Sequence, residues 1–199
     1  MSHPLFPAML ELTDRPVLVV GAGAVALRKT GQLLACGARV TVVAPEVHPG
    51  FAELPVTVER RAFAPGDTTG YRLVLTATGD RAVDQAVFDE AEAAGLWVNS
   101  ADDPARCSFI LPAVLRQGPI TVSVSTAGVS PALASWLRAE LGALIGPDFA
   151  DLAADLAAER AAIRATGAST EDIDWRPIIE EKLRERAISP LAPRDGAPS

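Results

Sequence analysis

The first half of the chain alternates short apolar runs with longer amphipathic segments. An apolar run that begins at Val17 is followed by a segment with apolar residues at helical spacing, and this order then repeats. Such runs are typical of strands buried on both faces, and the segments between several of them are long enough to be helices. We therefore expect strands beginning at Val17 and over 39–43, 56–60, 73–76 and 96–99, and helices over 24–36 and 81–94.

Strands separated by helices of this length form parallel βαβ units. The pattern therefore predicts a Rossmann-like parallel sheet over residues 1–112, with a binding crevice at the carboxyl ends of the strands.

The pattern changes after Asp102. Residues 108–111 and 120–125 resemble strands joined by a turn at 116–119, with no full helix between them. Ser130 and Pro131 have the pattern of an N-cap and a first helical residue. We also expect helices over 148–164 and 170–187, the second capped within the T-E-D sequence at its start, and a frayed tail over the last dozen residues. The fold class is thus α/β: a Rossmann-like domain over 1–112, a small α+β segment over 113–146 and a C-terminal helical segment over 147–199.

Glycines follow the first apolar run in the spacing G-x-G-x-x-A, formed by Gly21, Gly23 and Ala26. In this pattern the first glycine permits a tight turn, and the second lets the backbone approach a phosphate. The final small residue allows a helix to pack closely on the strand. The free N–H groups at the helix start then attract the pyrophosphate of a dinucleotide. The sequence therefore predicts a dinucleotide site at this turn.

Glu46 lies 20 residues beyond Ala26, at the end of the second expected strand. An acidic residue there can hydrogen-bond the ribose 2′-hydroxyl of NAD, although a solvated loop glutamate is an alternative reading. No basic residue follows directly to receive a 2′-phosphate, and His48 would be mostly neutral. The pattern favours NAD over NADP. The residues predicted to bind the cofactor are Gly21, Gly23, Ala24, Val25, Pro45, Glu46 and Thr78.

Composition excludes several other classes. The formal net charge of −7 argues against nucleic-acid binding, which needs a basic face. No apolar run approaches the roughly 20 residues of a membrane span. Cys36 and Cys107 are too few for a disulfide framework, so a cytoplasmic location is expected. His3 and His48 form no Cys/His cluster, so no resident metal site is predicted.

Four motifs carry a family resemblance. They are P-L-F at 4–6, G-A-G-A-V-A-L-R-K at 21–29, N-S-A-D-D-P-A-R-C-S-F-I-L-P at 99–112 and V-S-V-S-T-A-G-V-S-P-A-L-A at 122–134. In this order and spacing the chain resembles the precorrin-2 dehydrogenase family, which is the dehydrogenase/ferrochelatase module of siroheme synthases.

The resemblance implies that precorrin-2 loses a hydride to NAD and protons to solvent or a base, giving sirohydrochlorin. In some members the same pocket inserts ferrous iron. The family's key aspartate falls at Asp102, where a carboxylate can accept a proton. The alternative reading of Asp102 is a turn residue before Pro104. Asp103 is expected to be a solvated turn residue.

The substrate carries eight carboxylates, so local positive charge and helix N–H groups are expected to bind it. Ser130, Asn99 and Arg106 are the predicted substrate-binding residues, with Arg116 and Arg138 as further candidates. Asn99 can also act by supporting its turn. The resemblance further implies a homodimer with much of its contact in 112–145, and the edge-like strand 120–125 is compatible with this.

A non-catalytic NAD-sensing regulatory module is the competing function. Such a module would keep the first 80 residues but would not need the motifs at 99–112 and 122–134. The methyltransferase domain that follows in some siroheme synthases has no counterpart in this sequence, so we expect another protein to methylate the precursor.

Overall fold

The computed structural model describes residues 4–189, which form parts of two compact units, 1–111 and 112–199. The predicted tail at the end of the chain lies almost entirely outside the described residues. No helix within residues 4–189 is long and apolar enough to cross a membrane.

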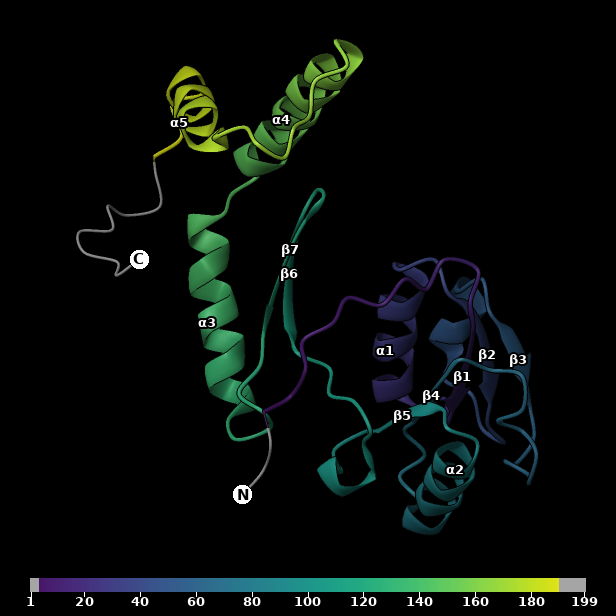
Figure 1. The fold of residues 1–199 in the computed structure, drawn as a ribbon. Coiled ribbons are helices and arrows are strands. Elements are labelled where there is room, and N and C mark those ends of the chain that lie inside the picture. Colours follow the sequence, from purple (N-terminus) through teal and green to yellow (C-terminus); the bar gives the residue numbers. More distant parts are fainter. Residues whose placement is uncertain (1–3, 190–199) are drawn as a thin grey trace. The chain divides into compact units, whose positions relative to one another are not determined.

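The first unit contains a five-stranded parallel sheet with the order β3-β2-β1-β4-β5 (Figure 1). The chain runs outward from β1 through β2 to β3 and then returns to form β4 beside β1, so the strand order reverses between β1 and β4. Ligands bind at such switch points in open parallel sheets. The strands are β1 (Pro16–Val20), β2 (Arg39–Val43), β3 (Thr57–Glu59), β4 (Leu73–Thr76) and β5 (Trp97–Ser100). The predicted α/β fold is confirmed.

Successive strand residues point to opposite faces of the sheet, and both faces are apolar. Val19 and Leu75 belong to the core cluster that includes residues of α1 (Ala24–Leu34). Val20 and Val74 belong to the opposite cluster, which includes residues of α2 (Arg81–Ala93). Burial on both faces explains why these strands are continuous apolar runs rather than alternating ones.

Register along β4 and β5 is regular. Leu73 pairs with Trp97, and the ladder continues to Thr76, which pairs with Ser100. The N–H of Ala101 donates to the Thr76 carbonyl at 2.8 Å, so the pairing extends to the end of both strands.

The predicted strand at 108–111 is wrong. Cys107 forms an isolated bridge with Asn99, and the Ser108 N–H donates to the Val98 carbonyl at 2.8 Å. The Phe109 carbonyl accepts a hydrogen bond from the Asn99 side chain at 3.0 Å. These backbone groups are therefore bound to β5 and its side chains, and the next strand begins at Ala113 instead.

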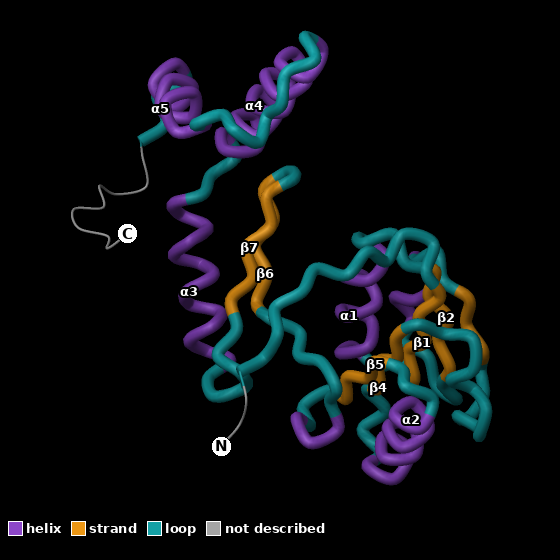
Figure 2. Tube along the Cα trace, viewed as in Figure 1, coloured by secondary structure: helices purple, strands orange, loops and turns teal. Residues whose placement is uncertain are grey.

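The second unit begins with an antiparallel hairpin of β6 (Ala113–Gln117) and β7 (Ile120–Val124). Helix α3 (Pro131–Leu144) packs along both strands, and Figure 2 shows the hairpin and helix side by side. The helices α4 (Asp148–Ala165) and α5 (Trp175–Glu185) follow and contact each other.

The expected cap of the last helix is wrong. Asp174 caps α5, with its carboxylate accepting from the Arg176 N–H at 3.0 Å. Thr170 is buried and serves other contacts. Its carbonyl accepts a hydrogen bond from the Trp175 indole at 3.2 Å, and its hydroxyl oxygen accepts one from Arg160 Nε on α4 at 3.4 Å. A side chain bound to α4 in this way cannot also cap a helix that starts several residues later.

Candidate functional site: a dinucleotide cavity and a neighbouring acidic turn

Gly21 forms the sharp turn between β1 and α1. Its φ of +99° lies in a region that residues with a side chain rarely adopt. A Cβ atom at this position would lie 2.4 Å from the Ala77 carbonyl oxygen, so the backbone after β4 occupies the space. The N–H of Gly21 donates to the Val43 carbonyl at 2.9 Å. The turn is therefore fixed by the protein's own packing against β2 and β4.

Gly23 has a different environment. It is the N-cap residue of α1, its φ is −80°, and no side chain caps the helix there. A Cβ atom on Gly23 would have no neighbour within 4 Å. The open space in front of an uncapped helix N-terminus can receive an anionic group. Ala26, one turn later, is completely buried, as close packing of helix on strand requires.

A cavity of about 590 Å³ opens at this turn, at the carboxyl ends of β1, β2 and β4. Five of the seven predicted cofactor residues line it, whereas Ala24 and Val25 do not, although both begin α1. The five are Gly21, Gly23, Pro45, Glu46 and Thr78. The lining also includes Ala22, Val47, His48, Ala62, Phe63, Asp80 and Val83.

The charged residues of the cavity wall are acidic. Glu46 and Asp80 line it, and no Lys or Arg is among the described lining residues. The His48 Nδ1 accepts a hydrogen bond from the Gly50 N–H at 3.1 Å. A ribose with free hydroxyls suits these acceptors, whereas a 2′-phosphate would meet like charge.

A buried carboxylate holds the wall of the cavity after β4. Asp84 in the first turn of α2 is 8% exposed and accepts hydrogen bonds from the hydroxyls of Thr76 and Thr78. Asp80 caps the same helix, accepting from the Ala82 N–H at 2.8 Å. Sequence analysis missed Asp84. Its only signal was an acidic residue in the first helical turn, eight residues after a strand-end threonine.

Asp102 lies in an exposed turn directly after β5. Its φ of +60° is left-handed, a conformation that Asp and Asn adopt more readily than other residues with side chains. The turn is fastened by Asp103, which accepts from the Ala105 N–H at 3.1 Å and forms an ion pair with Arg106. The expectation that Asp103 is a solvated turn residue is therefore wrong, because Arg106 and the backbone bind it.

The predicted substrate residues of the first unit are largely engaged within the protein. Arg106 is 8% exposed, and it donates to Gln85 as well as to Asp103. Asn99 is 6% exposed, and its amide binds Lys29, Cys107 and the Phe109 carbonyl. These positions favour a structural role for Arg106 and Asn99 over direct contact with a ligand.

Cys107 completes the packing of this turn. Its thiol donates to the backbone carbonyls of Ser100 and Asp103. Burial is the main cause that raises the pKa of Cys107. A neutral thiol that donates to two carbonyls is a structural group in this site.

Ser130 lies in the second unit and caps α3. Its hydroxyl accepts from the Leu133 N–H at 3.2 Å, while its own N–H donates to the Thr126 hydroxyl at 3.0 Å. Arg138 follows on α3 and is partly buried, and Arg116 lies on β6. No group of three or more His, Cys, Asp or Glu side chains within residues 4–189 is arranged to hold a metal ion.

Two families match successive parts of the chain. Residues 8–113 match the family described as "Putative NAD(P)-binding", and residues 117–144 match "Sirohaem biosynthesis protein central". The first match covers more than half of the chain.

Curated relatives and a solved structure agree with these matches. The chain is 45% identical to siroheme synthase 2 of Aeromonas hydrophila over 70% of its length, and 38% identical to siroheme synthase of Methylobacillus flagellatus over 92%. The aligned parts are only 30% and 40% of those two relatives. The structure titled "SirC, precorrin-2 dehydrogenase" superposes with a TM-score of 0.73 at 26% identity, covering 92% of this chain and 99% of SirC. The chain therefore belongs to the family described as "Putative NAD(P)-binding", and it is similar to one part of the siroheme synthases and to SirC.

Proposed function

We propose that the chain catalyses the NAD-dependent oxidation of precorrin-2 to sirohydrochlorin. The observation that carries the proposal is the placement of two features after neighbouring strands: the dinucleotide cavity beside β4 and the Asp102 turn after β5. Similarity to SirC and to siroheme synthases supports the same reaction. An NAD sensor would need the cavity alone, and the match over 117–144 favours the enzyme.

NAD fits the residues of the cavity. The Gly21–Gly23 turn and the uncapped start of α1 suit its pyrophosphate, and Glu46 suits a ribose with both hydroxyls free. Bound NAD supplies a hydride acceptor.

Asp102 would accept a proton as the substrate loses its hydride. The carboxylate is exposed, and its backbone is fixed by the Asp103–Arg106 pair that follows. A base positioned in this way typically accelerates proton transfer by about 10²–10⁴-fold. The reaction then transfers one hydride from the substrate to the cofactor and releases protons to Asp102 and solvent.

Asp102→Asn tests this role. Asparagine retains the tolerance for left-handed backbone, so the turn should persist while the carboxylate is lost. We expect anaerobic NADH formation from precorrin-2 to fall by about 100-fold or more, with unchanged NAD affinity. Undiminished turnover by the variant would remove Asp102 from the mechanism. Failure of the folded, NAD-binding wild-type protein to form NADH would reject the dehydrogenase function.

We also propose ferrochelation as a second activity of this protein. Ferrous iron would enter as a substrate and be bound by the nitrogens of sirohydrochlorin, while Asp102 takes up pyrrole protons. The absence of a metal-binding side-chain cluster within residues 4–189 is compatible with iron as a passing substrate. Adding ferrous iron after NADH formation is complete, and following the tetrapyrrole spectrum, separates the two activities. An Asp102→Asn variant should lose both.

Other residues of the proposal bind the substrate. The start of α3 at Ser130 can receive a substrate carboxylate, and Arg116 and Arg138 supply positive charge in the same unit. Arg106 and Asn99 are retained as supports of the Asp102 turn, given their buried contacts. We also propose a cytoplasmic location, as the cysteine content leads us to expect.

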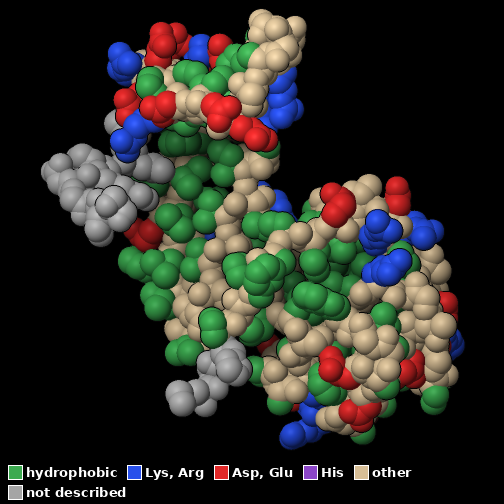
Figure 3. Space-filling view, viewed as in Figure 1, with side chains coloured by type: hydrophobic (Ala, Val, Ile, Leu, Met, Phe, Trp, Pro, Cys, Tyr) green, Lys and Arg blue, Asp and Glu red, His purple; other side chains and the backbone are tan. Residues whose placement is uncertain are grey.

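A homodimer is the proposed assembly. Helix α3 and the loop before it expose large apolar side chains: Val129 at 87%, Trp136 at 57% and Leu144 at 59%. Figure 3 shows hydrophobic side chains gathered over this helix. Exposed apolar side chains gathered on one helix are typical of a protein–protein contact. We expect a dimer by light scattering and a monomer for Trp136→Glu, with NAD affinity unchanged. A monomeric wild-type protein would reject the dimer.

A further inference from the structure

Lys29 is a partly buried cation that lacks a charged partner. It lies on α1, and its Nζ donates a hydrogen bond to the Asn99 Oδ1 at 3.2 Å. None of the ion pairs formed by residues 4–189 includes Lys29. The ammonium is therefore bonded to a neutral amide, although its surroundings remove part of its hydration.

Electrostatics at Lys29 favour the arrival of an anion. Burial lowers the pKa of Lys29, and the neighbouring Arg28 acts in the same direction. The charge of Asp102 acts in the opposite direction and has a smaller effect than burial, and no ion pair between Lys29 and Asp102 is among those of residues 4–189. A partly desolvated cation gains most from a partner of opposite charge that also accepts its remaining hydrogen bonds.

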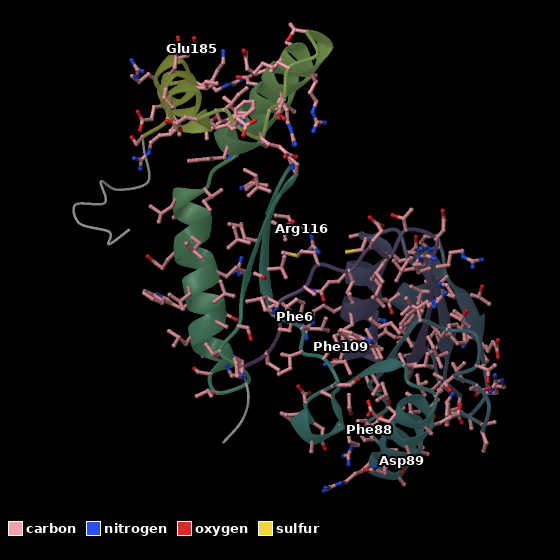
Figure 4. All side chains as sticks on the ribbon, in the orientation of Figure 1. Phe6, Phe88, Asp89, Phe109, Arg116 and Glu185 are labelled. Carbon is pink, nitrogen blue, oxygen red and sulfur yellow. The ribbon has the colours of Figure 1, made fainter. Side chains whose placement is uncertain are left out.

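The position of the ammonium is fixed by Asn99. The Asn99 amide nitrogen donates to the Phe109 carbonyl at 3.0 Å and to the Cys107 sulfur at 3.4 Å, and its oxygen accepts from Lys29. Phe109 packs against the core cluster on the α1 face of the sheet, and Figure 4 shows it beside α1. Lys29, on α1, is thus held by Asn99 near the carboxyl end of β5, the strand that leads into Asp102.

Two anions could reach this position, a phosphate of the cofactor or a carboxylate of the substrate. The cavity at the glycine turn is lined by neither Lys29 nor Asn99 nor Asp102. The ammonium therefore lies outside the space that suits the pyrophosphate, near the proposed proton acceptor. Arg106, the cation closest to Asp102 in sequence, is already paired with Asp103.

We propose that Lys29 binds a carboxylate of the anionic tetrapyrrole beside Asp102, and that Asn99 positions the ammonium for this contact. The inference rests on the proposed function for the identity of the ligand. It assigns Asn99 an indirect part in substrate binding and gives Lys29 a role that the sequence motif did not reveal.

Lys29→Gln tests the proposal, with Arg28→Gln as the matched control. Arg28 is an exposed neighbour on the same helix, so both variants lose one positive charge. Sirohydrochlorin is titrated into the protein anaerobically, without NAD, and NAD is titrated separately. We expect the sirohydrochlorin Kd to rise about tenfold in Lys29→Gln and less than about twofold in Arg28→Gln. Lys29→Arg should restore most of the affinity, and NAD affinity should be unchanged in every variant.

Three results would overturn the assignment. An equal rise of the sirohydrochlorin Kd in both glutamine variants would show a long-range electrostatic effect rather than a direct contact at Lys29. A loss of NAD affinity confined to Lys29→Gln would assign the ammonium to a cofactor phosphate. Absence of sirohydrochlorin binding by the folded wild-type protein would reject the tetrapyrrole as the ligand of Lys29. Lys29-dependent binding without NADH formation from precorrin-2 would keep the carboxylate contact and reject the dehydrogenase function.

Discussion

The Asp84 carboxylate accepts a hydrogen bond from the Thr78 hydroxyl at 2.7 Å, and this contact holds the loop after β4 against α2. Thr76 donates to the same oxygen from the last position of the strand. One buried acidic group thereby satisfies two hydroxyls and supports one wall of the cofactor cavity.

Replacing Asp84 with alanine should destabilise the protein and weaken cofactor binding together. The Thr76 hydroxyl would lose its acceptor, and the Thr78 hydroxyl would keep only the Asp80 carbonyl, at a cost of about 1–3 kcal/mol in the free energy of unfolding. Urea denaturation measures this cost, and an NAD titration measures the effect on the cavity. Asp89→Ala is the control, because Asp89 lies on the same helix and its side chain is exposed (Figure 4). Equal destabilisation by both variants would contradict the role assigned to Asp84.

Alanine at the two glycines should separate folding from binding. In Gly21→Ala the new Cβ would meet the Ala77 carbonyl and the backbone would be strained, so we expect a loss of roughly 3 kcal/mol or more in stability. Gly23→Ala adds a methyl group in open space, so the melting temperature should stay nearly constant. NAD affinity should nevertheless fall by about tenfold or more, because the methyl group occupies the approach of a phosphate. Unchanged NAD affinity in Gly23→Ala would place the pyrophosphate elsewhere.

Glu46 should determine the preference for NAD over NADP. Glu46→Arg replaces an acceptor for the ribose hydroxyls with a donor for a 2′-phosphate, so the ratio of NADP to NAD affinity should rise by roughly tenfold or more. Glu53→Arg makes the same charge change at an exposed position that does not line the cavity. A similar change of preference in both variants would show a long-range effect of charge.

Stability in acid should depend on Asp67. The hydrogen bonds from Arg61 lower the pKa of Asp67 below its ordinary value, with a smaller contribution from the Ala64 N–H. The folded protein thus binds this proton less readily than the unfolded chain. The stabilisation is complete above the unfolded pKa of about 4 and disappears as the pH falls through the lower, folded value. The stability difference between wild type and Asp67→Asn should therefore be full at neutral pH and shrink below about pH 4. A difference that is constant from neutral to strongly acidic pH would contradict this.

The sheet and its glycine turn could be predicted because their signals are local. Each buried strand is a continuous apolar run, and Gly21 and Gly23 stand directly between a strand and a helix. The place of Glu46 in the cavity wall also follows from chain distance, since Glu46 lies three residues after β2, the neighbour of β1.

Contacts between residues far apart in the chain leave no comparable pattern in the sequence. Lys29 and Asn99 are 70 positions apart, and nothing in either local pattern indicates their hydrogen bond. Residues 108–111 have strand-like composition, but the Asn99 side chain and the edge of β5 bind their backbone groups instead. Asp103 was misread for the same reason, since a short 3-10 helix over Pro104–Arg106 brings Arg106 to its carboxylate.

The register of β4 and β5 has a consequence for the reaction itself. Thr76 and Ser100 are partners in the ladder, and Thr78 and Asp102 each follow two residues later. The separation between the cofactor cavity and the proposed proton acceptor is therefore set by the spacing of two hydrogen-bonded strands, about 4.8 Å, and by equal chain lengths beyond them. An insertion of one residue in β5 would shift Asp102 relative to the cavity without altering any residue that lines the cavity. Strand length thus acts as a determinant of activity that no substitution at the site would reveal.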